Sequence, residues 1–231
     1  MSDHAASALL IEGLGRSFGQ REVVRDLEVS LARGERLALC GPNGSGKTTV
    51  LRCIAGTITP TAGRIRIFGH AAGSRKARSL IGVSLSQERS FYLRLTGREN
   101  LLLFARLRGL SKRAAARKID ELADELEVTE LLSQRTDRCS SGQLQQLAFA
   151  RALVGDPVLL VLDEPTRSLD ADARARFWAA LMRRPRAAGV IATHLDEDVM
   201  RATTVVDLEA RNIHARPADG QPTATVVDGG A

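Results

Sequence analysis

Residues 41–49 contain the most constraining stretch of this 231-residue chain, the glycine-rich run GPNGSGKTT. It matches the pattern G-x-x-x-x-G-K-[ST] and lies between an apolar, strand-like run, RLALC, and a segment with helical periodicity. In that context the glycines let backbone N–H groups turn inward around an anion, and the start of the helix adds its positive end. The ammonium group of Lys47 would reach the outer phosphates of a nucleotide, and the hydroxyl of Thr48 would be offered to Mg²⁺. The predicted phosphate contacts come from Gly41, Pro42, Asn43, Gly44, Ser45, Gly46, Lys47, Thr48 and Thr49.

Strand-like runs rich in aliphatic residues recur along the chain. They are ALLIEGL, RLALCG, RIRIFG, LIGVSLS, VLLVLDE, GVIATH and TTVVDL. Several of them are almost continuously apolar, as strands buried on both faces of a parallel sheet tend to be. Helical patterns, notably GKTTVLRCIAG and DADARARFWAALMRR, alternate with them. The alternation predicts a wound α/β core with a mainly parallel sheet.

The pattern changes between about Glu88 and Gly155, where three helical segments follow one another without a strand-like run. Thr96 is the predicted N-cap of the first helix, with Glu99 completing a capping box, and Ser111 is the predicted N-cap of the second. We therefore expect one domain at 1–215 with a helical sub-domain inserted at about 88–155. The tail at 216–231 has no periodicity, and we expect it to be disordered.

Polar side chains stand at the ends of three of the predicted strands. The run VLLVLDEP ends in two carboxylates, of which Asp163 is expected to order Mg²⁺ and Glu164 to act as the general base on the attacking water. Gln87 follows LIGVSLS, and His194 follows GVIAT. Because α/β folds bind ligands at the carboxyl ends of their strands, Gln87 and His194 are candidates to meet the terminal phosphate and its water.

Composition narrows the classes of partner. The formal net charge of +6 admits anionic partners, but aromatic residues make up only 3 % of the chain, which is too few for a surface that stacks nucleic-acid bases. No nucleic acid partner is therefore expected. Cys40, Cys53 and Cys139 form no metal or disulfide pattern, and no apolar run approaches the ~20 residues that a bilayer requires. We expect a soluble, cytosolic chain that can dock on a membrane protein.

The order of these motifs resembles the ATP-binding cassette (ABC) family over about residues 7–208. The shared features are an aromatic residue near the start, the phosphate loop, the glutamine, the helical insert, the signature CSSGQ at 139–143, the Asp-Glu strand end, SLD, and the histidine. The resemblance implies a phosphate-loop NTPase fold with N-terminal antiparallel strands. It also implies a cassette that binds ATP and Mg²⁺ and hydrolyses ATP to power a membrane transporter.

Further site residues follow from the resemblance alone. It implies that Phe18 stacks on adenine, that Gln87 contacts Mg²⁺ or the lytic water, that His194 holds the γ-phosphate, and that Asp170 shapes a dimer contact. In this family two cassettes pack head to tail, and the signature loop of one covers the ATP of the other. The expected signature contacts are Ser140, Ser141, Gly142 and Gln143. The loop differs from the usual Leu-Ser-Gly-Gly-Gln at Cys139 and Ser141, and serine adopts positive φ less readily than glycine.

The same resemblance predicts the setting of the cassette. Its partners would be integral membrane transporter subunits and a second cassette, identical or closely related, at the inner face of the cell membrane. The runs QERSFYLRLTGREN and EPTRSLD are similar to the drug and polysaccharide exporter branch. The alternative is a soluble ABC ATPase acting on nucleic acid or ribosomes, although such relatives usually carry two cassettes, a coiled coil or zinc inserts. A kinase or GTPase would not explain the signature loop, and no NKxD motif is present.

One apolar stretch in the insert is a candidate interface. The run SFYLRL at 90–95 concentrates Phe91, Tyr92, Leu93 and Leu95 just before a capped helix. An exposed apolar patch usually marks an interface, so we expect this run to dock on the membrane partner. The alternative is that these side chains pack into the core of the helical insert.

Overall fold

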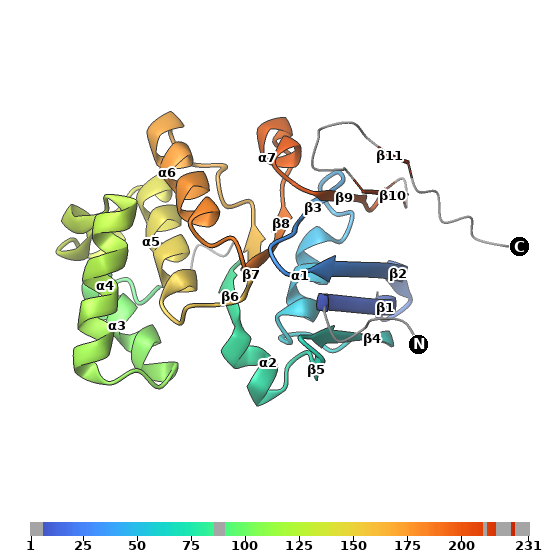
Figure 1. The fold of residues 1–231 in the computed structure, drawn as a ribbon, viewed down its shortest axis with the longest axis horizontal. Coiled ribbons are helices and arrows are strands. Elements are labelled where there is room, and N and C mark those ends of the chain that lie inside the picture. The colour runs from blue at the N-terminus through green and yellow to red at the C-terminus, as the bar shows by residue number, and fades with distance from the viewer. Residues whose placement is uncertain (1–6, 86–90, 210–211, 216–222, 225–231) are drawn as a thin grey trace, which may run out of the picture. The chain divides into compact units, whose positions relative to one another are not determined.

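The computed structural model describes residues 7–85, 91–209, 212–215 and 223–224. The chain divides into two compact units (Figure 1). The first comprises residues 1–81, 158–164 and 186–231, and the second comprises residues 82–157 and 165–185. The first unit contains most of the strands, and the second is mainly helical.

The first unit begins with an antiparallel sheet of strand order β2-β1-β4-β5. Its strands are β1 (Ser7–Phe18), β2 (Arg21–Ala32), β4 (Ala62–Ile67) and β5 (His70–Ala71). The sequence patterns above did not predict β2. Its buried residues Val24, Leu27, Val29 and Leu31 do not alternate regularly, because Asp26 adopts a positive φ of 46° and the pairing with β1 shifts register nearby.

A parallel core completes the first unit. Strands β3 (Arg36–Cys40), β7 (Leu159–Asp163), β8 (Ala188–Ala192) and β9 (Thr204–Asp207) are arranged in the order β9-β3-β8-β7. β10 (Asn212–Ala215) and β11 (Thr223–Ala224) extend the edge of this sheet beyond β9, and β6 (Ile81–Ser84) begins at the boundary of the units, with residues 82–84 in the second. Every residue of β7 and β8 is buried, which explains their continuous apolar sequences. The predicted α/β core with a mainly parallel sheet is confirmed.

Three helices belong to the first unit. α1 (Lys47–Ile54) contacts β7 and β8 of one sheet and β2 of the other (Figure 1). α2 (Arg75–Leu80) packs on β4 and β5, and α7 (Asp196–Met200) packs near β3. Neither α2 nor α7 was predicted, because five or six residues are too few to show a helical period. β11 falls in the tail expected to be disordered, and the rest of 216–231 lies outside the described residues.

The second unit is built from packed helices. They are α3 (Gly97–Leu107), α4 (Lys112–Leu126), α5 (Ser141–Leu153) and α6 (Ala171–Met182), with the 3₁₀ turns η1 (Thr129–Leu132) and η2 (Thr136–Arg138). Thr96 forms the expected capping box with Glu99, and Ser111 caps α4. The helical pattern of the second segment continues to Leu132, but α4 ends at Leu126 because Glu127 adopts a left-handed conformation with φ 54°. None of the described helices has the combined length and apolar content needed to cross a bilayer.

Asn100 fixes the chain that leads into α3. Its side chain is fully buried. Its Oδ1 accepts from the N–H of Tyr92 at 2.9 Å, and its Nδ2 donates to the carbonyls of Tyr92 and Thr96, both at 3.1 Å. Asn100→Leu should lower the free energy of unfolding by about 2–4 kcal/mol, because the part-buried N–H of Tyr92 loses its partner. Urea unfolding measures this effect.

Leu107, on the same helix and 73 % exposed, supplies the matched control. Leu107→Asn should change the free energy of unfolding by less than about 0.5 kcal/mol. Equal unfolding midpoints for Asn100→Leu and the unchanged protein would contradict the structural role of Asn100.

Candidate nucleotide-binding site

The loop after β3 is shaped by glycine. Gly41, Gly44 and Gly46 have positive φ values of 131°, 84° and 103°. A Cβ atom at Gly41 would lie 2.8 Å from the Ser45 hydroxyl, and one at Gly46 would lie 3.0 Å from the Val23 carbonyl oxygen. The loop leads directly into α1, whose N-terminus has no side-chain cap and no acidic residue in its first turn. The first N–H groups of α1 are therefore available to an anion.

Two side chains in the loop have the donor chemistry that phosphate requires. Lys47 is only 8 % exposed, and its Nζ donates to the carbonyls of Gly41 at 2.6 Å and Pro42 at 3.0 Å. The hydroxyl of Ser45 is buried and has no hydrogen-bond partner in the described part of the chain. A buried hydroxyl without a partner is costly, so its presence in this loop fits a phosphate oxygen as the acceptor.

Two oxygen groups suited to Mg²⁺ meet beside the loop. The hydroxyl of Thr48 donates to Oδ2 of Asp163 at 2.9 Å, and Asp163, the last residue of β7, is 2 % exposed. Within the described residues, no group of three or more His, Cys, Asp or Glu side chains could hold a metal ion. Mg²⁺ usually takes one or two carboxylates and completes its shell with phosphate and water. The Thr48 and Asp163 pair fits that requirement.

Glu164 and His194 form a second pair. Oε2 of Glu164 lies 2.7 Å from Nδ1 of His194, and the two side chains are 14 % and 50 % exposed. The backbone of Glu164 has a positive φ of 48°, a conformation that costs a non-glycine residue roughly 1–3 kcal/mol. Its N–H donates to the carbonyl of Ala192 at 2.8 Å, which holds that conformation. Strain of this kind at a polar strand end is typical of active sites.

A brace next to His194 was not predicted from the sequence. The hydroxyl of Thr193 donates to Oδ2 of the buried Asp198 at 2.9 Å and accepts from the N–H of Leu195 at 3.1 Å. These bonds fix the turn that carries His194 away from β8. Thr193 and Asp198 are ordinary polar residues in the sequence, so no local signal could have identified the brace.

The predicted site residues of the first unit come from neighbouring strands. β3 leads to the phosphate loop, β7 ends at Asp163, and β8 lies between β3 and β7 and leads to His194. Phe18, the last residue of β1, is 46 % exposed, and the guanidinium of Arg16 lies 4.4 Å from its ring centroid. Gln87 lies outside the described residues.

The signature loop belongs to the second unit. Ser140 is the N-cap of α5: its hydroxyl accepts from the N–H of Gln143 at 3.2 Å, and its own N–H donates to the Gln143 side chain at 2.8 Å. Ser141 is the first residue of α5, so its backbone is right-handed and serine replaces glycine without the strain of a positive φ. Gly142 is required, because a Cβ atom there would lie 2.5 Å from the carbonyl oxygen of Ser168.

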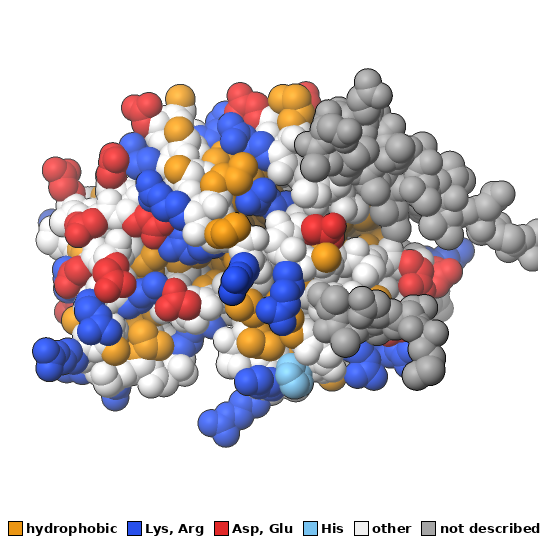
Figure 2. Space-filling model, viewed as in Figure 1, with side chains coloured by type: hydrophobic (Ala, Val, Ile, Leu, Met, Phe, Trp, Pro, Cys, Tyr) orange, Lys and Arg blue, Asp and Glu red, His pale blue; other side chains and the backbone are white. Residues whose placement is uncertain are grey.

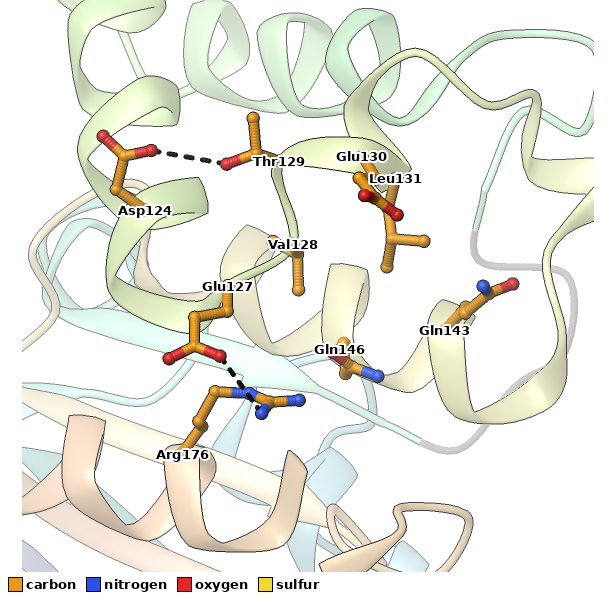
Figure 3. Close-up of a pocket in the computed structure, with 9 residues that line it drawn as sticks. All are labelled: Asp124, Glu127, Val128, Thr129, Glu130, Leu131, Gln143, Gln146 and Arg176. Atoms are coloured by element: carbon orange, nitrogen blue, oxygen red, sulfur yellow. Dashed lines mark hydrogen bonds and ion pairs between the residues drawn. The ribbon is translucent and has the colours of Figure 1, made fainter. Parts of the chain in front are cut away.

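Two more features surround this loop. Asp170 is the N-cap of α6, and its Oδ1 accepts from the N–H of Ala173 at 2.8 Å. A pocket of about 550 Å³ opens beside the start of α5 (Figure 3). It is lined by Asp124, Glu127, Val128, Thr129, Glu130, Leu131, Gln143, Gln146 and Arg176. The lining contains three acidic side chains and one arginine, which Glu127 already binds at 3.3 Å, so this pocket does not suit a phosphate.

Comparison with known proteins identifies the family. The sequence profile described as ABC transporter matches residues 24–167, which include the phosphate loop, the signature loop and the Asp163–Glu164 strand end. The chain belongs to the ABC transporter family. Like the other ATP-binding subunits of this family, it is an ATPase, which binds and hydrolyses ATP. Phe18, Asp170 and His194 lie outside the matched range.

Similar proteins support this assignment. The Nod factor export ATP-binding protein I of Rhizobium sp. (strain N33) is 38 % identical over 230 residues, covering 95 % of this chain and 72 % of the relative. The protein of the same name from Bradyrhizobium diazoefficiens is 36 % identical over 225 residues, with coverage of 95 % and 72 %.

Solved structures agree with the fold. An ATP-binding subunit of an ABC transporter is 27 % identical with a TM-score of 0.78, covering 87 % of this chain and 85 % of that one. A dimeric bacterial ABC transporter cassette has a TM-score of 0.77 at 21 % identity, covering 86 % of this chain and 93 % of that one. These likenesses confirm the predicted phosphate-loop NTPase fold.

Proposed function

We propose that this cassette powers a membrane exporter, at the cytoplasmic face of the membrane, by ATP-driven association of two cassettes. The names of the similar rhizobial proteins support export, and the motif order supports a cassette that works in pairs. The observation that carries the proposal is the pairing of Thr48 with Asp163 and of Glu164 with His194 beside the phosphate loop. The alternative, a soluble ABC ATPase acting on nucleic acid or ribosomes, has no observation in its favour.

The loop residues would hold the phosphates of ATP. The first N–H groups of α1 and the hydroxyl of Ser45 donate to phosphate oxygens, and Lys47 exchanges its two loop carbonyls for outer phosphate oxygens. Thr48 and Asp163, together with Gln87, would hold Mg²⁺, which when bound neutralises charge that develops on the phosphates. The exposed ring of Phe18 offers a face for adenine.

Glu164 is the proposed general base. As a general base Glu164 must be an ionised carboxylate, which only accepts hydrogen bonds, so in this role it would accept from an Nδ1–H of His194. This bond and the backbone bond to Ala192 fix the carboxylate beside the phosphate loop, where it would take a proton from water. We assign His194 to orienting this carboxylate and to contact with the terminal phosphate, and Gln87 to contact with Mg²⁺ or the water.

The signature loop would serve a second cassette. The start of α5 presents backbone N–H groups and the Ser140 hydroxyl, the donors that a terminal phosphate requires. The chain's own phosphate loop already supplies such donors to its own nucleotide, so the residues at 140–143 are assigned to the ATP of the partner cassette. Asp170, at the start of α6, is assigned to the contact between cassettes. The partner would be a second copy or a close relative.

The proposed docking segment is Tyr92 and Leu93, which are 58 % and 48 % exposed, whereas Leu95, expected to share it, is part-buried. The expectation that Phe91 belongs to the exposed surface is wrong. Phe91 is only 7 % exposed, and the guanidinium of Arg151, itself held between the rings of Phe91 and Phe104, lies 4.6 Å from its centroid. Burial of Arg151 lowers its pKa to about 10, consistent with a cation enclosed by apolar rings. Ser90 lies outside the described residues.

Tyr92→Glu combined with Leu93→Glu should abolish copurification with an integral membrane protein, because two charges replace the exposed apolar anchors of the docking segment. ATP binding should persist, since neither side chain is buried. Affinity purification from detergent-solubilised membranes, followed by mass spectrometry, measures the effect.

Leu107→Glu with Met200→Glu is the matched control, since these side chains are 73 % and 67 % exposed. This control should copurify the membrane partner as the unchanged chain does. Undiminished recovery of that partner by the docking-segment variant would place the interface elsewhere, and recovery of ribosomes or nucleic acid in its place would favour the alternative function.

A further inference from the structure

Charge is distributed unevenly along this chain. Residues 36–87 contain no Asp or Glu but eight Lys and Arg. These are Arg36, Lys47, Arg52, Arg64, Arg66, Arg75, Lys76 and Arg78. Because the whole chain carries +6, all its other residues together carry −2. The positive charge of the protein therefore arises in this one stretch, and the phosphate loop uses only Lys47.

Much of this charge reaches one surface of the first unit. α2 packs on β4 and β5, and Arg75, Lys76 and Arg78 are exposed on it while Ala77 is buried. Arg66 is exposed on β4 between the buried Ile65 and Ile67. Arg33 belongs to the same surface, because its guanidinium lies 4.7 Å from the ring centroid of Phe68, a residue of the turn that connects β4 to β5. Figure 2 shows Lys and Arg side chains projecting from the region of α2 and β5. We call Arg33, Arg66, Arg75, Lys76 and Arg78 the basic surface.

The cations of the basic surface are not neutralised within the described part of the chain. Arg66 donates to the carbonyl of Gly69 and Arg78 to that of Gly73, and neither bond supplies a negative charge. The neighbouring Arg64 is different, since Glu12 binds it at 2.6 Å. Glu35, close in sequence to Arg33, accepts instead from the N–H of Ala32. These five exposed cations therefore have no acidic partner among the residues that the structure describes.

The kind of partner follows from what this surface lacks. The exposed large apolar side chains of the described residues are Phe18, Tyr92, Leu93, Leu107, Met182 and Met200, and none belongs to the basic surface. Protein interfaces rely on aromatic or apolar anchors, and single-stranded nucleic acid relies on aromatic stacking. A layer of anionic lipid headgroups needs neither, because it attracts clustered Lys and Arg through charge alone. We propose that the basic surface binds the anionic phospholipid headgroups of the cytoplasmic leaflet.

This inference rests on the proposed function only for the setting of the cassette at a membrane. Each Lys or Arg near an anionic lipid surface strengthens binding about fivefold. This attraction between the cations and the lipid surface is electrostatic, and it decays over about one Debye length, which is about 10 Å at 0.1 M salt. Binding should therefore require anionic lipid and weaken steeply with salt.

Vesicle sedimentation of the purified full chain tests the proposal. Vesicles of 70 % phosphatidylcholine and 30 % phosphatidylglycerol are compared with pure phosphatidylcholine at 0.1 M and 0.5 M salt. Arg75→Glu with Lys76→Glu and Arg78→Glu is the test variant. The matched control is Lys112→Glu with Arg113→Glu and Arg117→Glu, three exposed cations of α4. Each triple substitution brings the formal net charge from +6 to zero, so only the position of the charge differs.

The unchanged chain should bind the anionic vesicles at 0.1 M salt and release them at 0.5 M. The test variant should lose about a hundredfold in vesicle affinity, and the control should stay within about threefold. If the test variant does not fold, Arg75→Gln with Lys76→Gln should still lose about 25-fold in vesicle affinity.

Equal losses of vesicle affinity in test and control, or undiminished binding by the test variant, would overturn the proposal. If the test variant binds vesicles normally but no longer copurifies with the membrane partner, the basic surface would be assigned to a protein instead. ATP hydrolysis without vesicles should be unchanged in both variants, which separates failure of this proposal from failure of the proposed function.

Discussion

Glu164→Gln is expected to lower the rate of ATP hydrolysis by at least about a hundredfold, the typical contribution of a general base. An amide keeps the volume of the carboxylate and can still accept from Nδ1 of His194, but it cannot take a proton from water. Nucleotide binding should persist, because Lys47, Thr48 and the glycines of the loop are untouched. Phosphate release measures turnover, and equilibrium binding of a fluorescent ATP analogue measures affinity.

Glu12→Gln is the matched control. Like Glu164, Glu12 is a carboxylate with a side-chain partner, here Arg64, but it lies on β1 and outside the proposed site. Its substitution should leave turnover within about twofold of the unchanged chain, as expected for a surface ion pair. Turnover by Glu164→Gln at the unchanged rate would remove Glu164 from the role of base.

Much of the fold could be predicted because its core is encoded locally. β3, β7 and β8 are short apolar runs, and their burial on both faces of the sheet produces that pattern directly. The capping box at Thr96 and the N-cap at Ser111 similarly locate two helix starts. β2 was missed because the positive φ of Asp26 interrupts its alternation, and the end of α4 was missed because a glutamate, and not a glycine, adopts the left-handed cap.

The site residues were predictable only where a charged or hydroxyl side chain directly follows an apolar, strand-like run. Lys47, Thr48, Asp163, Glu164 and His194 are identified by their position after apolar runs. The hydrogen bond between Glu164 and His194 spans 30 residues of sequence and could not be deduced locally. The strained backbone of Glu164 and the buried hydroxyl of Ser45 depend on surrounding atoms, so only the structure reveals them.

Apolar composition also could not separate core from interface. Phe91 and Tyr92 are adjacent aromatic residues, yet Phe91 packs against Arg151 while Tyr92 is exposed. The difference arises because Asn100 binds both the N–H and the carbonyl of Tyr92 and so fixes the direction of the chain there. Sequence patterns reveal that such side chains are present, whereas the hydrogen bonds of a buried residue such as Asn100 decide which of them are exposed.

The central claim is that the phosphate loop of one cassette and the signature loop of another form one ATP site. Two variants separate these loops, both in the Glu164→Gln background so that bound ATP is retained. Lys47→Ala removes the ammonium group from the phosphate loop, and Ser140→Arg replaces the hydroxyl at the start of α5 with a bulky side chain. Each homodimer should fail to retain ATP through gel filtration, because each of its sites carries one defect. Loss of the N-cap at Ser140 should cost about 1 kcal/mol, so urea unfolding must confirm that this variant is folded.

Mixing the two variants, with different affinity tags, is the most direct measurement. In the heterodimer both defects fall on one composite site, and the other site combines an intact Lys47 with an intact Ser140. Our account predicts that retention of ATP returns at about one nucleotide per heterodimer, half of the two that a pair of complete sites would hold. If heterodimers recovered through both tags retain no ATP, each signature loop serves its own chain and the claim of a shared site is contradicted.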